Sequence, residues 1–213
     1  ASEDTRYAKY YRHGEFSKSS IIPGLKYDST DDFLLPRSGM SWNTYFDIAA
    51  LGGDEEFIKN HSSFSWFWGL EDEIDYDLIL RLKARGGYIW DNGYLPINQK
   101  FYLGGISTLR GFKSGSLSPR DDEDFRIGGK RLFANSLEAS VPILEGIKMR
   151  LAFFYDYGMI GEESFDEISR SSVGGAVEWV SPLGPIHLIF PFPLDDEEGD
   201  DTSSFEFTMG TQF

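Results

Sequence analysis

The stretch IKMRLAFFYDYG, residues 147–158, decides the fold class, because its side chains alternate in character at every second position. The odd-numbered positions, from Ile147 to Tyr157, are all apolar or aromatic. The even-numbered positions, from Lys148 to Gly158, are mostly polar or small. A period of two puts alternate side chains on opposite faces of a β-strand and does not fit a helix. The stretch therefore predicts a strand with one apolar and one polar face.

The same alternation recurs along the chain and predicts about nine strands. It occurs over 40–50, 64–70, 78–85, 132–141, 171–180 and 205–213, and more weakly near 17–28, where Pro23 and Gly24 interrupt it. Short turns are expected at 36–39, 71–75, 142–146 and 181–185, and longer polar loops at 91–127, 159–169 and 195–203. Alternating short and long connections are typical of an antiparallel up-and-down meander, the plan of transmembrane β-barrels.

Composition excludes several other classes of protein. The 213 residues carry a formal charge of −15, which argues against a nucleic-acid partner. The chain has no cysteine, so disulfides and thiolate metal sites are excluded. No apolar run approaches the roughly 18–20 residues of a membrane helix, which leaves membrane strands open. The chain begins without Met or a signal peptide, which indicates a mature product or a fragment of a longer protein.

The alternation fits two kinds of β-protein, a soluble sandwich or lipocalin-like barrel and a membrane barrel. Large aromatic residues on the apolar faces favour the membrane barrel, because they resemble the aromatic girdles at the bilayer interfaces. We expect these near strand ends at Trp66, Trp68, Tyr155, Tyr157, Trp179 and Phe213. The opposite faces mix small and charged residues, as a hydrated lumen would.

The chain offers no recognisable catalytic or metal-binding pattern. Its histidines, His13, His61 and His187, show no metal-ligand spacing, and no nucleotide-binding or hydrolase motif occurs. We therefore expect no enzyme activity, cofactor or metal. The acidic runs 121–124 and 195–201 lack the spacing of a calcium loop and are interpreted as solvated loops. Weak divalent-ion binding there, bridging lipopolysaccharide phosphates, stays open.

One arginine in the longest loop has candidate partners on the strands. Arg110 lies in STLRGF (107–112), while Glu138 and Asp156 fall on the polar faces of neighbouring predicted strands. A carboxylate enclosed in a barrel is costly unless it is paired, and arginine pairs with carboxylates in bidentate fashion. The residues alone leave two hypotheses: the arginine pairs with these acids, or both acids face a water-filled lumen.

Several motifs in order resemble the BamA and two-partner-secretion transporter superfamily of outer-membrane barrels. FYLGGISTLRGF (101–112) resembles the family's loop-six signature, and FYDYG (154–158) its aromatic-x-Asp-x-Gly motif. GGKRLFANSLEASVP (128–142) resembles the strand between them, VEWVSPLGPIHLIF (177–190) a Ser-Pro-Leu-Gly-Pro turn, and FEFTMGTQF (205–213) the carboxy-terminal β-signal. FLLPRSG (33–39) is similar to a periplasmic turn of the family.

The resemblance implies an all-β, antiparallel up-and-down transmembrane barrel of about 16 strands in the bacterial outer membrane. Residues 1–213 would be the carboxy-terminal portion of this one domain, with a lumenal loop six at about 91–127. The first strands and the periplasmic POTRA domains would lie outside the chain. Arg110, Gly111 and Phe112 would form a loop-six latch, with Glu138 and Asp156 as its partners on the barrel wall.

The resemblance also implies a function without chemical catalysis. An incoming strand would template on the lateral seam beside the last strand by β-augmentation, which inserts β-barrel clients into the membrane. The last strand, 204–213, would carry the β-signal residues Phe207, Gly210 and Phe213. Partners would be unfolded β-barrel clients, assembly lipoproteins, outer-membrane lipid and lipopolysaccharide. A protein-secreting pore is the alternative within the same superfamily.

Overall fold

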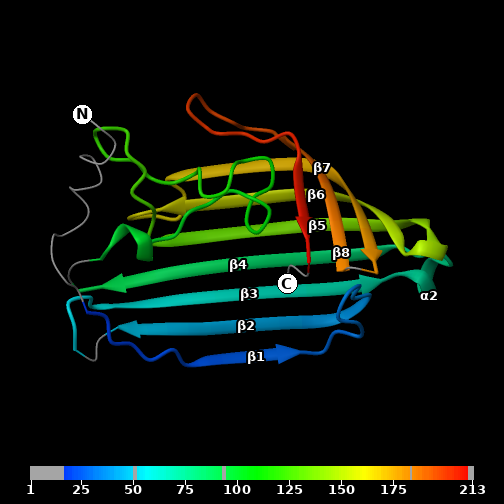
Figure 1. Ribbon diagram of the computed structural model, residues 1–213, viewed down its shortest axis with the longest axis horizontal. Coiled ribbons are helices and arrows are strands. Elements are labelled where there is room, and N and C mark those ends of the chain that lie inside the picture. Colours follow the sequence, from blue (N-terminus) through cyan, green and yellow to red (C-terminus); the bar gives the residue numbers. More distant parts are fainter. Residues whose placement is uncertain (1–16, 50–51, 93–94, 183, 211–213) are drawn as a thin grey trace.

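The computed structural model describes residues 17–49, 52–92, 95–182 and 184–210. Within these ranges nine strands form a single antiparallel sheet in which neighbours follow the chain order (Figure 1). The strands are β1 (Gly24–Asp28), β2 (Ser38–Ala49), β3 (Phe57–Gly69), β4 (Ile79–Asp91), β5 (Arg131–Leu144), β6 (Met149–Gly161), β7 (Ile168–Ser181), β8 (Gly184–Pro193) and β9 (Glu206–Met209). The helical turns are α2 (Glu71–Ile74), η1 (Ile97–Gln99) and η2 (Glu145–Ile147). The predicted up-and-down meander is confirmed, and β1 and β9 form the edges of the described sheet.

The connections divide between the two ends of the sheet. Figure 1 shows the turn with α2 at one end, whereas the longer connections gather at the opposite end. The sheet curls, so that β8 and β9 pass in front of the middle strands (Figure 1). The segment between β4 and β5, residues 92–130, is called the long loop below. It folds back over the inner face of the sheet, which is the face that carries Glu138 and Asp156.

The exposed outer face of the sheet is apolar, whereas the inner face buries charged side chains beside its apolar ones. Leu137 on β5 is 52% exposed, whereas its sequence neighbour Glu138 is 6% exposed. The outer face exposes Met40, Trp42, Trp66, Trp68, Trp90, Leu137, Phe153, Tyr155, Phe190, Phe192, Phe207 and Met209. The inner face buries Asp47, Arg81, Glu138, Arg150, Asp156, Arg170, Glu178 and Glu206. This arrangement is that of a barrel wall with lipid outside and a polar interior, not that of a soluble sandwich. No helix in the described ranges is both long and apolar enough to cross a membrane.

The apolar core lies between the long loop and the inner face. Fully buried loop residues, including Leu103, Leu109 and Phe112, cluster with Leu132 on β5 and Ile160 on β6. The long loop is therefore a packed layer of the fold rather than a solvated connection.

Two strand glycines make room for side chains of the long loop. A Cβ built on Gly158 of β6 would lie 2.8 Å from the Leu103 Cδ1. A Cβ built on Gly87 of β4 would lie 2.3 Å from the Phe101 ring. Because real Cβ atoms do not approach so closely, glycine at these positions lets the loop lie directly on the wall.

Some predicted boundaries are wrong for a physical reason. β3 begins at Phe57 rather than at 64, because residues 59–63 in its first half are polar on both faces and show no alternation. On the outer face of that half, the Ser62 hydroxyl lies 2.8 Å from the Thr44 hydroxyl of β2, and such a pair leaves no apolar signal. Tyr155 lies in the middle of β6, not near a strand end as the girdle interpretation expected.

Candidate functional site

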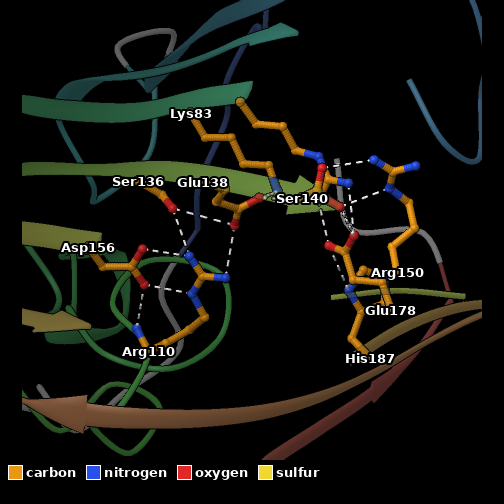
Figure 2. Close-up of polar contacts among 10 residues, drawn as sticks. Lys83, Arg110, Ser136, Glu138, Ser140, Arg150, Asp156, Glu178 and His187 are labelled. Carbon is orange, nitrogen blue, oxygen red and sulfur yellow. Dashed lines mark hydrogen bonds and ion pairs between the residues drawn. The ribbon is translucent and has the colours of Figure 1, made fainter. Parts of the chain in front are cut away.

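Arg110 spreads its guanidinium over two carboxylates of the inner wall. The Nε and Nη2 atoms each donate to Asp156 at 2.6 Å, and Nη1 lies 2.8 Å from Glu138 Oε1. The Nη2 atom also donates to the Ser136 hydroxyl at 2.7 Å (Figure 2). The guanidinium carbon lies 3.5 Å from the ring centre of Phe154. Arg110 is 8% exposed, so these charge-assisted contacts replace its water. We call this group the latch.

Strand register explains how the wall presents two acids to one cation. β5 and β6 pair so that Ser136 lies opposite Asp156, and Glu138 lies opposite Phe154. Paired residues in an antiparallel sheet share a face, and so do residues two apart on one strand. The four side chains therefore form one compact inner-face patch. The structure brings together the three residues that sequence analysis singled out.

The two residues after Arg110 have distinct structural roles. Gly111 has a φ of +92°, and a Cβ there would lie 3.3 Å from Pro191 and Pro193 of β8. Both the backbone angle and the space thus favour glycine. Phe112 is fully buried in the cluster beneath the long loop. Arg110 and Phe112 flank this glycine, and both side chains are buried.

The latch is the first step of a longer series of buried charges that sequence analysis missed. Glu138 Oε2 lies 3.4 Å from Arg81 Nη1, and Arg81 binds both carboxylate oxygens of Glu178 at 2.5 and 2.8 Å. Ser140 donates to Glu178 at 3.2 Å and accepts from Arg150 Nε at 2.9 Å (Figure 2). We call this series the charge ladder. In order it contains Arg110, Glu138, Arg81, Glu178, Ser140, Arg150, Asp77 and Arg37.

The charge ladder ends at the two connections that lead into β2 and β4, where Arg37 and Asp77 lie. Asp77 accepts from Arg150 Nη1 at 2.7 Å and from Arg37 Nη2 at 2.8 Å. Burial raises the pKa of the Asp77 carboxyl, but the hydrogen bond and charge of Arg150, followed by those of Arg37, hold that pKa below its ordinary value. The ladder thus runs from the long loop to the short-turn end of the sheet.

The predicted β-signal residues lie at the edge of the sheet. Phe207 is on the outer face of β9 and is 54% exposed. Gly210 follows the strand, has a φ of +115° and donates its amide to the Pro185 carbonyl at 2.8 Å. Phe213 lies outside the described residues. The structure does not bring Phe207 or Gly210 to the latch, whereas it does bring their neighbour Glu206 there.

Residues 195–199 of the acidic run 195–201 are exposed, which agrees with the interpretation as a solvated loop, but several acids of the run are also ion-paired. Asp200 Oδ2 accepts from Arg170 Nε at 2.7 Å, and Glu197 lies 2.7 Å from the same guanidinium. Asp201 accepts from Arg126 of the long loop at 2.6 Å, and this hydrogen bond and charge lower the pKa of its carboxyl. These ion pairs connect the β8–β9 connection to Arg170 of β7 and to Arg126 of the long loop. No cluster of three or more acids or histidines that could hold a metal occurs in the described part of the chain.

The missed residues left a partial signal in the sequence. Arg81, Arg150 and Glu178 fall on the polar faces of strands that the alternation predicts. Their pairing depends on register, because Arg81 lies opposite Glu138 and Arg150 lies opposite Glu178 only in the observed alignment of strands. A wrong register by two residues would separate these charges, and the alternation cannot detect that error.

Comparison with known proteins identifies the family. A family model described as the Omp85 superfamily domain matches residues 1–213. The chain belongs to the Omp85 superfamily. This Omp85 chain is 32% identical, over 97% of its length, to the outer membrane protein assembly factor BamA of Nitratidesulfovibrio vulgaris. It is 27% identical, over 87% of its length, to BamA of Neisseria meningitidis, and 29% identical over its full length to the human sorting and assembly machinery component 50 homolog.

The Omp85 chain covers only part of these relatives. It spans 27% and 28% of the two BamA proteins and 49% of the human protein. Among solved structures, BamA from Haemophilus ducreyi lacking POTRA domains 1–3 matches 88% of this chain with a TM-score of 0.78 and 23% identity. The match covers 41% of that structure and shows that the folds agree. The chain is thus an integral outer-membrane protein of the β-barrel type, and its described residues form nine antiparallel strands of one sheet.

Proposed function

We propose that this chain is the carboxy-terminal portion of a barrel that folds and inserts β-barrel proteins into the bacterial outer membrane. The observation that carries the proposal is the 32% identity to an outer membrane protein assembly factor across nearly the whole chain. The described fold supports it, because one face of the sheet is built for lipid and the other for a seated loop.

The proposed mechanism uses strand pairing rather than chemical catalysis. β9 is an edge strand of only four residues, Glu206–Met209, and an edge strand presents unpaired backbone groups that can template another strand. A client strand would add to this edge while the outer-face residue Phe207 keeps contact with lipid. Arg110 would act as a latch that holds the long loop on the wall while the seam opens and closes.

The rest of the protein would complete the site. We propose that about seven further strands close the barrel to a total of about 16, and that periplasmic POTRA domains precede them. Partners would be unfolded β-barrel clients, assembly lipoproteins, and the lipid and lipopolysaccharide of the outer membrane. The strongly acidic chain, with a formal charge of −15, does not suit a nucleic-acid partner.

Depletion of the full-length protein tests this function. The rate at which newly made outer-membrane barrels acquire heat-modifiable gel mobility should fall, and reconstitution of the purified protein into liposomes should accelerate folding of an added client. The proposal fails if other barrels remain correctly inserted after depletion.

A conductance measurement distinguishes the alternative within the superfamily. A protein-translocating pore should conduct in a planar bilayer, and a cognate passenger protein should block that conductance. Client folding in liposomes without such a block supports the assembly function, whereas passenger block without client folding would replace it with secretion.

A further inference from the structure

Glu206 at the start of β9 is a third acidic side chain close to the latch. Its Oε1 atom accepts a hydrogen bond of 3.0 Å from the backbone amide of Gly111, the residue that follows the latch arginine. Glu206 is 9% exposed, and its other oxygen, Oε2, is buried without a hydrogen-bond partner among the described residues. A buried carboxylate kept in this state calls for an explanation, because it costs stability.

The backbone next to Glu206 is also bound to the long loop. The amide of Ser203 donates to the Gly111 carbonyl at 2.8 Å, and the amide of Lys113 donates to the Asp201 carbonyl at 2.7 Å. Between these bonds, Phe112 and Thr202 form an antiparallel bridge. The long loop therefore pairs, strand to strand, with the residues that lead into β9.

Among the described residues, β9 has a short pairing with the rest of the sheet, followed by the bond from the Gly210 amide to the Pro185 carbonyl. It pairs with β8 through four positions, from Ile186↔Met209 to Ile189↔Glu206, whereas β7 pairs with β8 through ten. Short strand pairs at a sheet edge are weak, since each position adds only a small stabilisation. The contacts of the long loop are thus a large part of what positions this edge strand.

We propose that Glu206 is a positioning residue that couples the long loop to β9. While its carboxylate accepts the Gly111 amide, the seated loop holds β9 against β8. When the loop leaves the wall, β9 loses that support and its edge becomes free to pair with another strand. The role of this coupling in strand pairing rests on the proposed function. The coupling of the long loop to β9 does not.

Amide hydrogen exchange of the full-length protein in phospholipid vesicles tests the coupling. Glu206→Leu removes both acceptor oxygens at similar size, and Glu206→Gln keeps one acceptor. We expect Glu206→Leu to speed exchange about tenfold both in 107–113 and in 206–209, the factor that corresponds to about 1.4 kcal/mol of local stability. We expect Glu206→Gln to stay within about twofold of the unmodified protein, since the bond to Gly111 is retained.

Two outcomes overturn the proposal. One is faster exchange in β9 with an unchanged long loop, which would make Glu206 a local residue of its strand. The other is a Glu206→Gln variant that exchanges as fast as Glu206→Leu, which would deny the role of the acceptor. Glu198→Leu, which replaces an exposed acid of the preceding connection, is the matched control and should change neither segment.

A crosslink keeps the test decisive if Glu206→Leu does not fold. Lys113 and Asp201 are neighbours across the loop pairing, with Nζ and Oδ1 3.8 Å apart, and the chain has no cysteine of its own. Oxidation of Lys113→Cys with Asp201→Cys should slow exchange in 206–209 about tenfold relative to the reduced form. Unchanged exchange in 206–209 would refute the coupling. Neither measurement uses a client, so failure of client assembly would count against the proposed function alone.

Discussion

The guanidinium of Arg110 and the carboxylate of Asp156 form a bidentate pair, with both N–O distances at 2.6 Å. Asp156 also lies 3.3 Å from the backbone amide of Arg110, so the acid holds the main chain as well as the side chain. Asp156 is 1% exposed. The stability of such a buried ion pair depends on both members, because removal of one leaves the other charge buried and unpaired.

Replacement of Arg110 by Ala should release the long loop from the wall. Loss of one partner from a buried ion pair costs about 3–5 kcal/mol, since Asp156 and Glu138 would both lose this cation. We expect Arg110→Ala to lower the temperature at which the full-length protein loses its heat-modifiable mobility, and to expose the long loop to protease. Arg110→Lys should recover only part of the loss, because lysine cannot make the bidentate contact.

The control for this variant is Arg120→Ala in the same loop. Arg120 pairs with Asp124, whose side chain is 79% exposed, and an exposed pair contributes about 0–1 kcal/mol. Equal effects of Arg110→Ala and Arg120→Ala would refute the latch.

The two acids of the latch should differ in how tightly they depend on Arg110. Glu138 also lies 3.4 Å from both Arg81 and Lys83, whereas Asp156 makes its ion pair with Arg110. In double-mutant cycles on thermal stability, we expect the Arg110–Asp156 coupling to reach about 2 kcal/mol and the Arg110–Glu138 coupling to be smaller. A larger coupling for Glu138 would show that the ladder, not the bidentate pair, dominates.

The alternation of side chains predicted most of the strands and their faces, although it gave no separate range for β8 and missed the first half of β3. It placed Glu138 and Asp156 on one face of neighbouring strands, because a period of two fixes the face of every residue once the strand is known. It also predicted that the outer face is apolar. These features depend only on the order of residues inside each strand.

Contacts that depend on strand register and on the curl of the sheet could not be predicted from the alternation of side chains. The Arg81–Glu178 pair joins positions 97 residues apart, and the Gly111–Glu206 bond joins positions 95 apart. The first requires the alignment of four strands, and the second requires the sheet to curl until β9 meets the long loop. The sequence pattern also could not assign Gly158 its role, since only the folded loop shows Leu103 lying over it.

Gly158→Ala should unseat the long loop by steric conflict. Its new Cβ would lie 2.8 Å from Leu103 Cδ1, and overpacking of a closed site typically costs about 1–3 kcal/mol. The thermal midpoint of the heat-modified gel shift should therefore fall. Leu103→Ala in the same protein should restore part of the loss, although Leu103→Ala alone destabilises. Gly146→Ala, where nothing lies within 4 Å of the added Cβ, should leave the midpoint unchanged. Absence of rescue by Leu103→Ala would show that the conflict lies elsewhere.

The contribution of Asp77 should depend on pH in one direction. Its folded pKa lies below the ordinary value of 3.8, so its ion pairs stabilise the protein above that pH and are lost as pH falls through the folded pKa. At about pH 7 we expect Asp77→Asn to destabilise by about 1–3 kcal/mol through loss of its charge-assisted bonds to Arg150 and Arg37. The difference from the unmodified protein should shrink below pH 3.8. Asp72→Asn, on the exposed helical turn nearby, is the matched control and should leave the stability at about pH 7 unchanged. A constant difference for Asp77→Asn across pH would refute the assignment.

A charged side chain introduced on the outer face of β5 should hinder insertion into the membrane. Leu137 is 52% exposed on β5, between Leu82 of β4 and Tyr155 of β6, and its neighbour Glu138 faces inward. An arginine on the lipid face costs about 2–4 kcal/mol near the bilayer midplane. We therefore expect Leu137→Arg to reduce the yield of membrane-inserted full-length protein, measured by urea extraction of membranes, while Leu137→Ile leaves the yield unchanged. If Leu137→Arg inserts as well as Leu137→Ile, the exposed apolar face of β5 does not contact lipid, and the assignment of inner and outer faces must be reversed or abandoned.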